Sequence, residues 1–172
     1  NDYLDKFDPD SLRYVLASNM PENGDTDFSW NEYVRANNDE LVATYGNLVH
    51  RVLTMIHKNF GGHIADIPDF SITENQLLEG TIIEFNEISE LISQVRLRLA
   101  LQKIMRVAQS VNRYIDQEEP WKLIKTEPNR AHIVLSTCVA VINCIKIAIY
   151  PFLPFSSEKL HQILGLEKSV AE

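Results

Sequence analysis

The sequence predicts an all-α protein, an antiparallel helix bundle of four to five long helices with short helical additions at both ends. Three observations lead to this prediction. Helix-capping signals recur along the 172 residues, apolar residues return at helical spacing, and the alternation typical of strands is nearly absent. With 45% hydrophobic and 23% charged residues, the chain also has enough apolar side chains to bury a real core.

The first predicted helix begins at Asp8, which is expected to cap it, with Pro9 at the first helical position. A loop over residues 19–27 follows, because this stretch is rich in Asn, Gly, Pro and Asp. Ser29 then caps a long helix, and Glu32 is in the position that completes a capping box.

That long helix is expected to run to Phe60 and to end at Gly61-Gly62, with a polar point at residues 37–39 where it can bend. A linker over residues 63–72 contains Pro68 and leads to the next helix.

Thr73 is expected to cap this next helix, with Gln76 in the capping-box position. The helical pattern then continues to Gln117, which is too long for one helix of a compact domain. We therefore expect two helices that meet near residues 93–96.

After Pro120 and Trp121, a short turn leads to a strongly apolar helix over residues 129–150. Polar residues interrupt its apolar run, so the run predicts a core helix and not a membrane span. Pro151 and Pro154 end this helix, and a short last helix is expected over residues 158–164.

Two cysteines, Cys138 and Cys144, lie in this apolar helix. Six residues apart, they fall on different sides of a helix, which predicts free thiols and a reducing, cytoplasmic location.

One candidate binding surface follows the helix that ends near residue 117. A basic stripe of helical spacing leads toward Trp121, and Asn112 adds an amide; the stripe consists of Arg96, Lys103, Arg106 and Arg113. Cations for phosphates, a flat aromatic for a base and an amide for a base edge are what a single-stranded nucleic acid requires. The alternative is structural: a solvated helix face, and a tryptophan that covers the end of the core.

The net charge of −8 and the pI of about 5.1 count against a generic nucleic-acid binder, which is normally basic overall. Any RNA contact must therefore depend on a local patch. Only Glu158 and His161 have a metal-ligand spacing, and no phosphate-binding loop or nucleophile motif is present. The sequence predicts no catalytic residue and no metal site.

Several longer motifs are more specific, and they extend over nearly the whole chain. They resemble the C-terminal part of the methionyl-tRNA synthetases, which are class I aminoacyl-tRNA synthetases. The motifs are Phe7-Asp8-Pro9-Asp10-Ser11-Leu12-Arg13-Tyr14, Asp25-Thr26-Asp27-Phe28-Ser29-Trp30, Asn37 with Glu40-Leu41, Gly46-Asn47-Leu48-Val49-His50-Arg51-Val52, Asn112-Arg113-Tyr114, Pro120-Trp121 and Pro151-Phe152-Leu153-Pro154.

The resemblance implies a class I synthetase anticodon-binding domain that reads the CAU anticodon of methionine tRNA. It assigns base contacts to Asn47 and Arg51, which at i and i+4 share one helical face. It places Trp121, after Pro120, against the first anticodon base, a cytosine. It also assigns the surrounding pocket to Asn112, Arg113 and Tyr114, and leaves Arg96, Lys103 and Arg106 as phosphate-contact candidates.

The resemblance divides the chain into residues 1–28, a tail of the stem-contact region or connector, and residues 29–172, the anticodon-binding bundle. The KMSKS loop, the HIGH motif and a zinc knuckle are missing from the sequence. We therefore expect a part of methionine–tRNA ligase that is inactive alone, contains no cofactor and has the catalytic domain as its partner, while the parent enzyme uses ATP and Mg. Neither DNA nor a membrane is an expected partner. The rival interpretation is a helical protein-interaction module that does not bind RNA.

Overall fold

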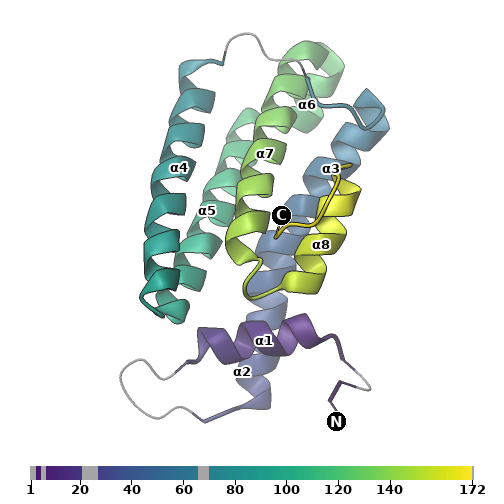
Figure 1. Cartoon of the computed structure of the whole chain (residues 1–172). Helices are drawn as coiled ribbons and strands as arrows, with labels where there is room; N and C mark the ends of the chain where they lie inside the picture. Colours follow the sequence, from purple (N-terminus) through teal and green to yellow (C-terminus); the bar gives the residue numbers. More distant parts are fainter. Residues whose placement is uncertain (1–2, 5–6, 21–26, 66–69, 172) are drawn as a thin grey trace.

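A computed structural model describes residues 3–4, 7–20, 27–65 and 70–171, and every regular element in these ranges is helical, which confirms the predicted fold class (Figure 1). Parts of the predicted loop 19–27 and of the linker 63–72 lie outside the described residues. The helices are α1 (Pro9–Ser18), α2 (Trp30–Arg35), η1 (Ala36–Gly46), α3 (Asn47–Phe60), α4 (Ile72–Ser93), α5 (Leu97–Glu118), α6 (Pro120–Thr126), α7 (Pro128–Ile149) and α8 (Pro154–Ile163).

The bundle consists of α4, α5, α7 and the continuous rod α2–η1–α3 (Figure 1). Helix α7 contacts α3, α4, α5, α6 and α8, so it lies at the centre. It is long and apolar enough to cross a membrane by composition, but 61% of its most apolar window is buried among the other helices, as in a core helix. Cys138 is buried and Cys144 half-buried, and both are free thiols.

The helix starts confirm some sequence predictions and correct others. Asp8 caps α1, accepting a hydrogen bond from the Asp10 amide at 2.8 Å, as expected. The predicted cap at Thr73 is wrong: Ser71 is the N-cap of α4, and Glu74 completes a capping box with it. The sequence contains two overlapping Ser/Thr-x-x-Glu/Gln patterns here, and Glu74 also gains an ion pair with Arg130, which favours the earlier start.

Two further corrections concern the C-terminal half. The segment after Pro120 is the short helix α6 and not a turn, because Pro120 and Pro128 each occupy a first helical turn. The last helix begins four residues before its predicted start, because Pro154 also occupies a first helical turn. The junction between α4 and α5 falls where it was predicted, over residues 94–96.

The rod from Ser29 to Gly61 has its predicted ends, and the polar point at residues 37–39 lies within the π-helix η1. In a π-helix each turn holds more residues, so the next helix changes phase. The last residue of the π-helix, Gly46, lies close to the backbone of the preceding turn. A side chain would be crowded there, because a Cβ at position 46 would lie only 3.1 Å from the Leu41 carbonyl oxygen. Directly after Gly46, α3 begins with Asn47, the first candidate site residue.

Candidate nucleic-acid interface

Trp121 lies in the first turn of α6, at the end of the bundle opposite α1 (Figure 1). The chain turns sharply at Glu119, which has a left-handed conformation (φ 47°), and the next residue, Pro120, is buried. Proline suits this position because its fixed φ matches the first helical residue. The tryptophan therefore lies at the start of a short helix, and 39% of its surface is exposed.

The Arg51 guanidinium of α3 lies over the Trp121 ring, with 5.6 Å between its carbon and the ring centroid. The same guanidinium donates to the Asp116 carboxylate of α5 at 3.0 Å. Two candidates that are 70 positions apart in the sequence thus form one exposed cation–π contact.

Asp116 was not predicted as a site residue. It lies four residues after Asn112, so the two side chains share one face of α5, and this i, i+4 pair was the signal available in the sequence.

Asn47 lies one turn before Arg51 on α3 and is exposed. Its amide has no hydrogen-bond partner in the part of the chain that the structure describes. Asn112 joins α5 to η1, because its amide nitrogen donates to the Thr44 carbonyl oxygen at 3.1 Å and to Ala108 at 3.2 Å. The Asn112 side-chain oxygen accepts no hydrogen bond among the described residues, so it remains available as an acceptor. We name Asn47, Arg51, Asn112, Asp116 and Trp121 the Trp121 edge.

Tyr114 lies in the core instead of on this edge: it is 4% exposed, and its hydroxyl donates to the Glu74 carboxylate. Glu74 is fully buried and forms an ion pair with Arg130 at 2.7 Å, and Arg130 also pairs with Glu118 at 2.7 Å. We name Glu74, Tyr114, Glu118 and Arg130 the buried cluster. It fastens α4, α5 and α7 together behind the Trp121 edge.

These hydrogen bonds and ion pairs shift the pKa values of Glu74 and Tyr114. Burial alone would raise the pKa of Glu74, but hydrogen bonds from Arg130, Ser71 and Tyr114 lower it to about 2. Burial and the neighbouring Glu74 carboxylate both raise the pKa of the Tyr114 hydroxyl. Both groups therefore keep one protonation state around neutral pH.

The predicted basic stripe is divided in the structure. Lys103 forms ion pairs with Glu84, at 2.9 Å, and with Glu87 of α4. Arg96 precedes α5, which places it about 25 Å along the helix from Arg113 at a rise of about 1.5 Å per residue. Arg96 and Trp121 are thus at opposite ends of the bundle.

Arg106 and Arg113 remain together. Both are exposed and line one groove of about 560 Å³ between α4 and α5. Among the described residues, neither forms an ion pair. These two arginines are therefore the members of the stripe that are available to an anion.

Comparison with known families gives the class of protein, the helical anticodon-binding domains of class I aminoacyl-tRNA synthetases. Residues 66–171 match the family model described as the anticodon-binding domain of methionyl tRNA ligase, and residues 1–53 match the model of class I tRNA synthetases (M). The chain belongs to the methionyl-tRNA ligase anticodon-binding domain family.

Individual relatives agree with this assignment. The chain is 43% identical over 171 residues to a methionine–tRNA ligase from Chloroflexus aurantiacus and 44% identical to one from Chloroflexus aggregans, covering 99% of this chain in each case. It spans 28% of the length of these two relatives. Among solved structures, apo methionyl-tRNA synthetase from Mycobacterium tuberculosis superposes with a TM-score of 0.86 at 27% identity, over 91% of this chain and 32% of that one.

Proposed function

We propose that this chain binds the anticodon loop of methionine tRNA and selects the CAU anticodon for a methionine–tRNA ligase. The observation that carries this proposal is the Arg51–Trp121 contact, with its 5.6 Å separation, on an exposed edge. An arginine and a tryptophan held together by two different helices present a cation and a stacking surface to the same nucleotide.

Four residues of the Trp121 edge have roles in this proposal. Trp121 stacks on the first anticodon base, a cytosine, which contributes about 1–3 kcal/mol. Asn47 and Arg51 contact base edges, where a good polar pair adds about 1–3 kcal/mol of discrimination. Asn112 supplies its remaining acceptor from the side of α5.

Phosphate contacts belong to Arg106 and Arg113 in this proposal, because Lys103 is already paired with two carboxylates. Such contacts add affinity that falls as salt rises, without choosing a sequence. Tyr114 takes part indirectly, since it fixes α5 from within the core.

The chemistry of the longer protein lies outside this chain. The parent ligase would use ATP and Mg to activate methionine and transfer it to tRNA in the cytoplasm, and the present chain would be inactive alone. Its contribution is to hold one anticodon at a fixed place relative to the catalytic domain.

A binding titration tests the proposal at one stated low salt, with two anticodon stem-loops. One carries CAU and the other differs only in its first anticodon base. We expect about a 5- to 150-fold preference for CAU, equivalent to about 1–3 kcal/mol. The preference should disappear in Trp121→Ala, because the stacking platform is removed.

The chain offers a matched control in Trp30, which is 59% exposed on α2 at the other end of the bundle (Figure 1). Trp30→Ala should leave the preference unchanged. Equal binding of both stem-loops by the unaltered chain would contradict the proposal and favour a helical protein-interaction module.

A further inference from the structure

The turn between α5 and α6 has a strained backbone, and it leads directly to Trp121. Glu119 joins the two helices in the left-handed conformation, which costs free energy for a residue other than glycine. Such a conformation persists only where the surrounding contacts hold it in place. Because Trp121 follows two residues later, the contacts that hold this turn also determine where the indole ring lies.

Contacts of two kinds hold the turn. Within the turn, the Glu119 amide donates to the Ile115 carbonyl oxygen at 2.9 Å, and the Glu119 carbonyl oxygen accepts from the Lys122 amide at 2.8 Å. A contact of longer range comes from Glu118, the last residue of α5, whose carboxylate accepts from the Arg130 guanidinium of α7 at 2.7 Å. Glu118 therefore ties the end of α5 to the central helix of the bundle.

This tie is better protected from water than the exposed pair at the Trp121 edge. The Glu118 side chain is 22% exposed, whereas that of Asp116, the partner of Arg51, is 62% exposed. Arg130 is itself held by the buried Glu74 carboxylate at 2.7 Å. Because a partly buried pair is screened less by salt and water, the Arg130–Glu118 pair is suited to fix the backbone.

The contact between Trp121 and Arg51 does not fix the ring to the same degree. Their separation of 5.6 Å is that of a cation–π contact, which is weak at an exposed site. The position of the indole ring therefore depends mainly on the backbone that enters α6.

We propose that Glu118 is a positioning residue for anticodon recognition. Through its ion pair with Arg130 it holds the turn at Glu119, and it thereby keeps the Trp121 ring beside Arg51, ready to stack on a base. This inference rests on the proposed function, because Glu118 acts on base selection only through Trp121.

Two substitutions at Glu118 separate its position from its charge. Glu118→Ala and Glu118→Gln both remove a negative charge near the RNA-binding edge, but the glutamine amide oxygen still accepts a hydrogen bond from Arg130. Arg130 keeps its ion pair with Glu74 in both variants, so we expect both to fold.

Tryptophan fluorescence tests the position of the ring without RNA. The chain has two tryptophans, so Trp30→Phe leaves Trp121 as the single fluorescent indole. In this background, Glu118→Ala should raise the acrylamide quenching constant of Trp121, because the released turn exposes more of the ring. Glu118→Gln should leave the constant close to its original value.

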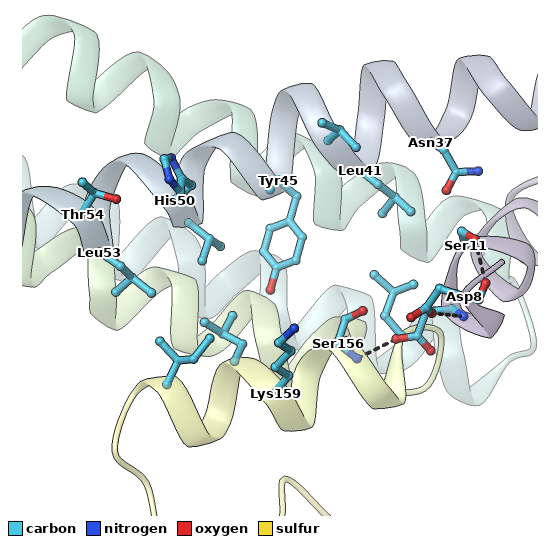
Figure 2. A pocket seen from close by; sticks show the side chains of 17 residues that line it. Asp8, Ser11, Asn37, Leu41, Tyr45, His50, Leu53, Thr54, Ser156 and Lys159 are labelled. Atoms are coloured by element: carbon cyan, nitrogen blue, oxygen red, sulfur yellow. Dashed lines mark hydrogen bonds between the residues drawn. The ribbon is translucent and has the colours of Figure 1, made fainter. Parts of the chain in front are cut away.

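Glu40 of η1 provides a matched control. It is also a half-buried carboxylate that ties two elements together, because it accepts a hydrogen bond from the Tyr14 hydroxyl of α1. At this junction Ser11 of α1 and Asn37 of η1 line a groove (Figure 2), and Trp121 lies at the opposite end of the bundle (Figure 1). Glu40→Ala should lower the free energy of unfolding but leave the quenching of Trp121 unchanged.

The stem-loop titrations measure the consequence for recognition. Glu118→Ala should lower the preference for CAU by about 2- to 30-fold, the range for residues that act on a ligand through others. Glu118→Gln and Glu40→Ala should keep the preference. In Trp121→Ala, the further change Glu118→Ala should not weaken CAU binding again, because the ring that it positions is gone.

Three results would overturn the proposal. They are unchanged quenching of Trp121 in Glu118→Ala, equal effects of Glu118→Ala and Glu118→Gln, and a loss of CAU affinity that persists in Trp121→Ala. Equal binding of both stem-loops by the unaltered chain would instead contradict the proposed function. The quenching measurement uses no RNA, so the two failures are distinguishable.

Discussion

Two clusters of the same chemistry lie on opposite sides of the last turns of α5, and they differ in exposure. Each combines an arginine, an acidic residue and an aromatic ring. In the buried cluster the Glu74 side chain is 0% exposed, and Arg130 and Tyr114 both bond to it. At the Trp121 edge the Asp116 side chain is 62% exposed, and Arg51 is its single ion-pair partner in the described residues.

The difference shows how α5 can be held firmly in the bundle on one side and present exposed polar groups on the other. The Glu74 carboxylate accepts from three side chains and from the Ser71 amide, so its burial is compensated inside the protein. Water screens the Arg51–Asp116 pair, which makes it weak and easy to exchange for a ligand. The buried cluster positions α5, and in the proposed complex the exposed pair can rearrange when a nucleotide arrives.

The largest expected effect comes from breaking the buried cluster. Arg130→Ala leaves Glu74 charged and buried without its ion partner, which should lower the free energy of unfolding by about 3 kcal/mol. Urea denaturation followed by far-UV circular dichroism measures this loss.

Arg51→Ala is the control for that experiment, because it removes an arginine from the exposed pair. It should cost less than about 1 kcal/mol of stability. Its binding to the CAU stem-loop should nevertheless fall. Similar stability losses in the two variants would show that exposure does not separate the clusters.

A second prediction uses pH to sharpen the comparison. The folded-state pKa of Glu74 is about 2, below its ordinary 4.5, so its contribution to stability is fully present above about pH 4.5. It should be lost as the pH falls from about 4.5 to about 2, because the unfolded chain then binds a proton that the folded chain does not.

Glu74→Gln should lack this component of acid destabilisation. The stability difference between the unaltered chain and Glu74→Gln should therefore shrink as the pH falls through that interval, in urea titrations at several pH values. A constant difference across the interval would contradict the assignment of the low pKa to Glu74.

Local signals in the sequence predicted the fold well. Asp8, Ser29 and Gly61 have their expected roles at helix ends, because capping depends on neighbours in the chain. The start of α4 was missed because two capping patterns overlap, and the choice between them depends on Arg130, which is 56 positions from Glu74. Contacts of that range cannot be derived from local spacing.

The same limit applies to the site. Helical periodicity predicted that Asn47 and Arg51 share a face, but not that this face meets Trp121 or Asp116. The π-helix η1 also changes the phase of the rod, and no simple pattern predicted it. For the basic stripe, spacing gave no information on the acidic residues of α4 that pair with Lys103.

The smallest expected effect tests the exposed pair from its acidic side. Asp116→Asn removes a negative charge that lies 3.0 Å from the Arg51 guanidinium and would repel a nearby phosphate. RNA binding should therefore become tighter, by up to about 5-fold, which corresponds to the 1 kcal/mol limit of an exposed pair. The gain should be similar for the CAU and the altered stem-loop and should shrink as salt rises, because it is electrostatic. A gain for only the CAU stem-loop would mean that Asp116 contacts the first base itself. In that case the exposed cluster would contribute to base selection through its carboxylate as well as through Arg51 and Trp121.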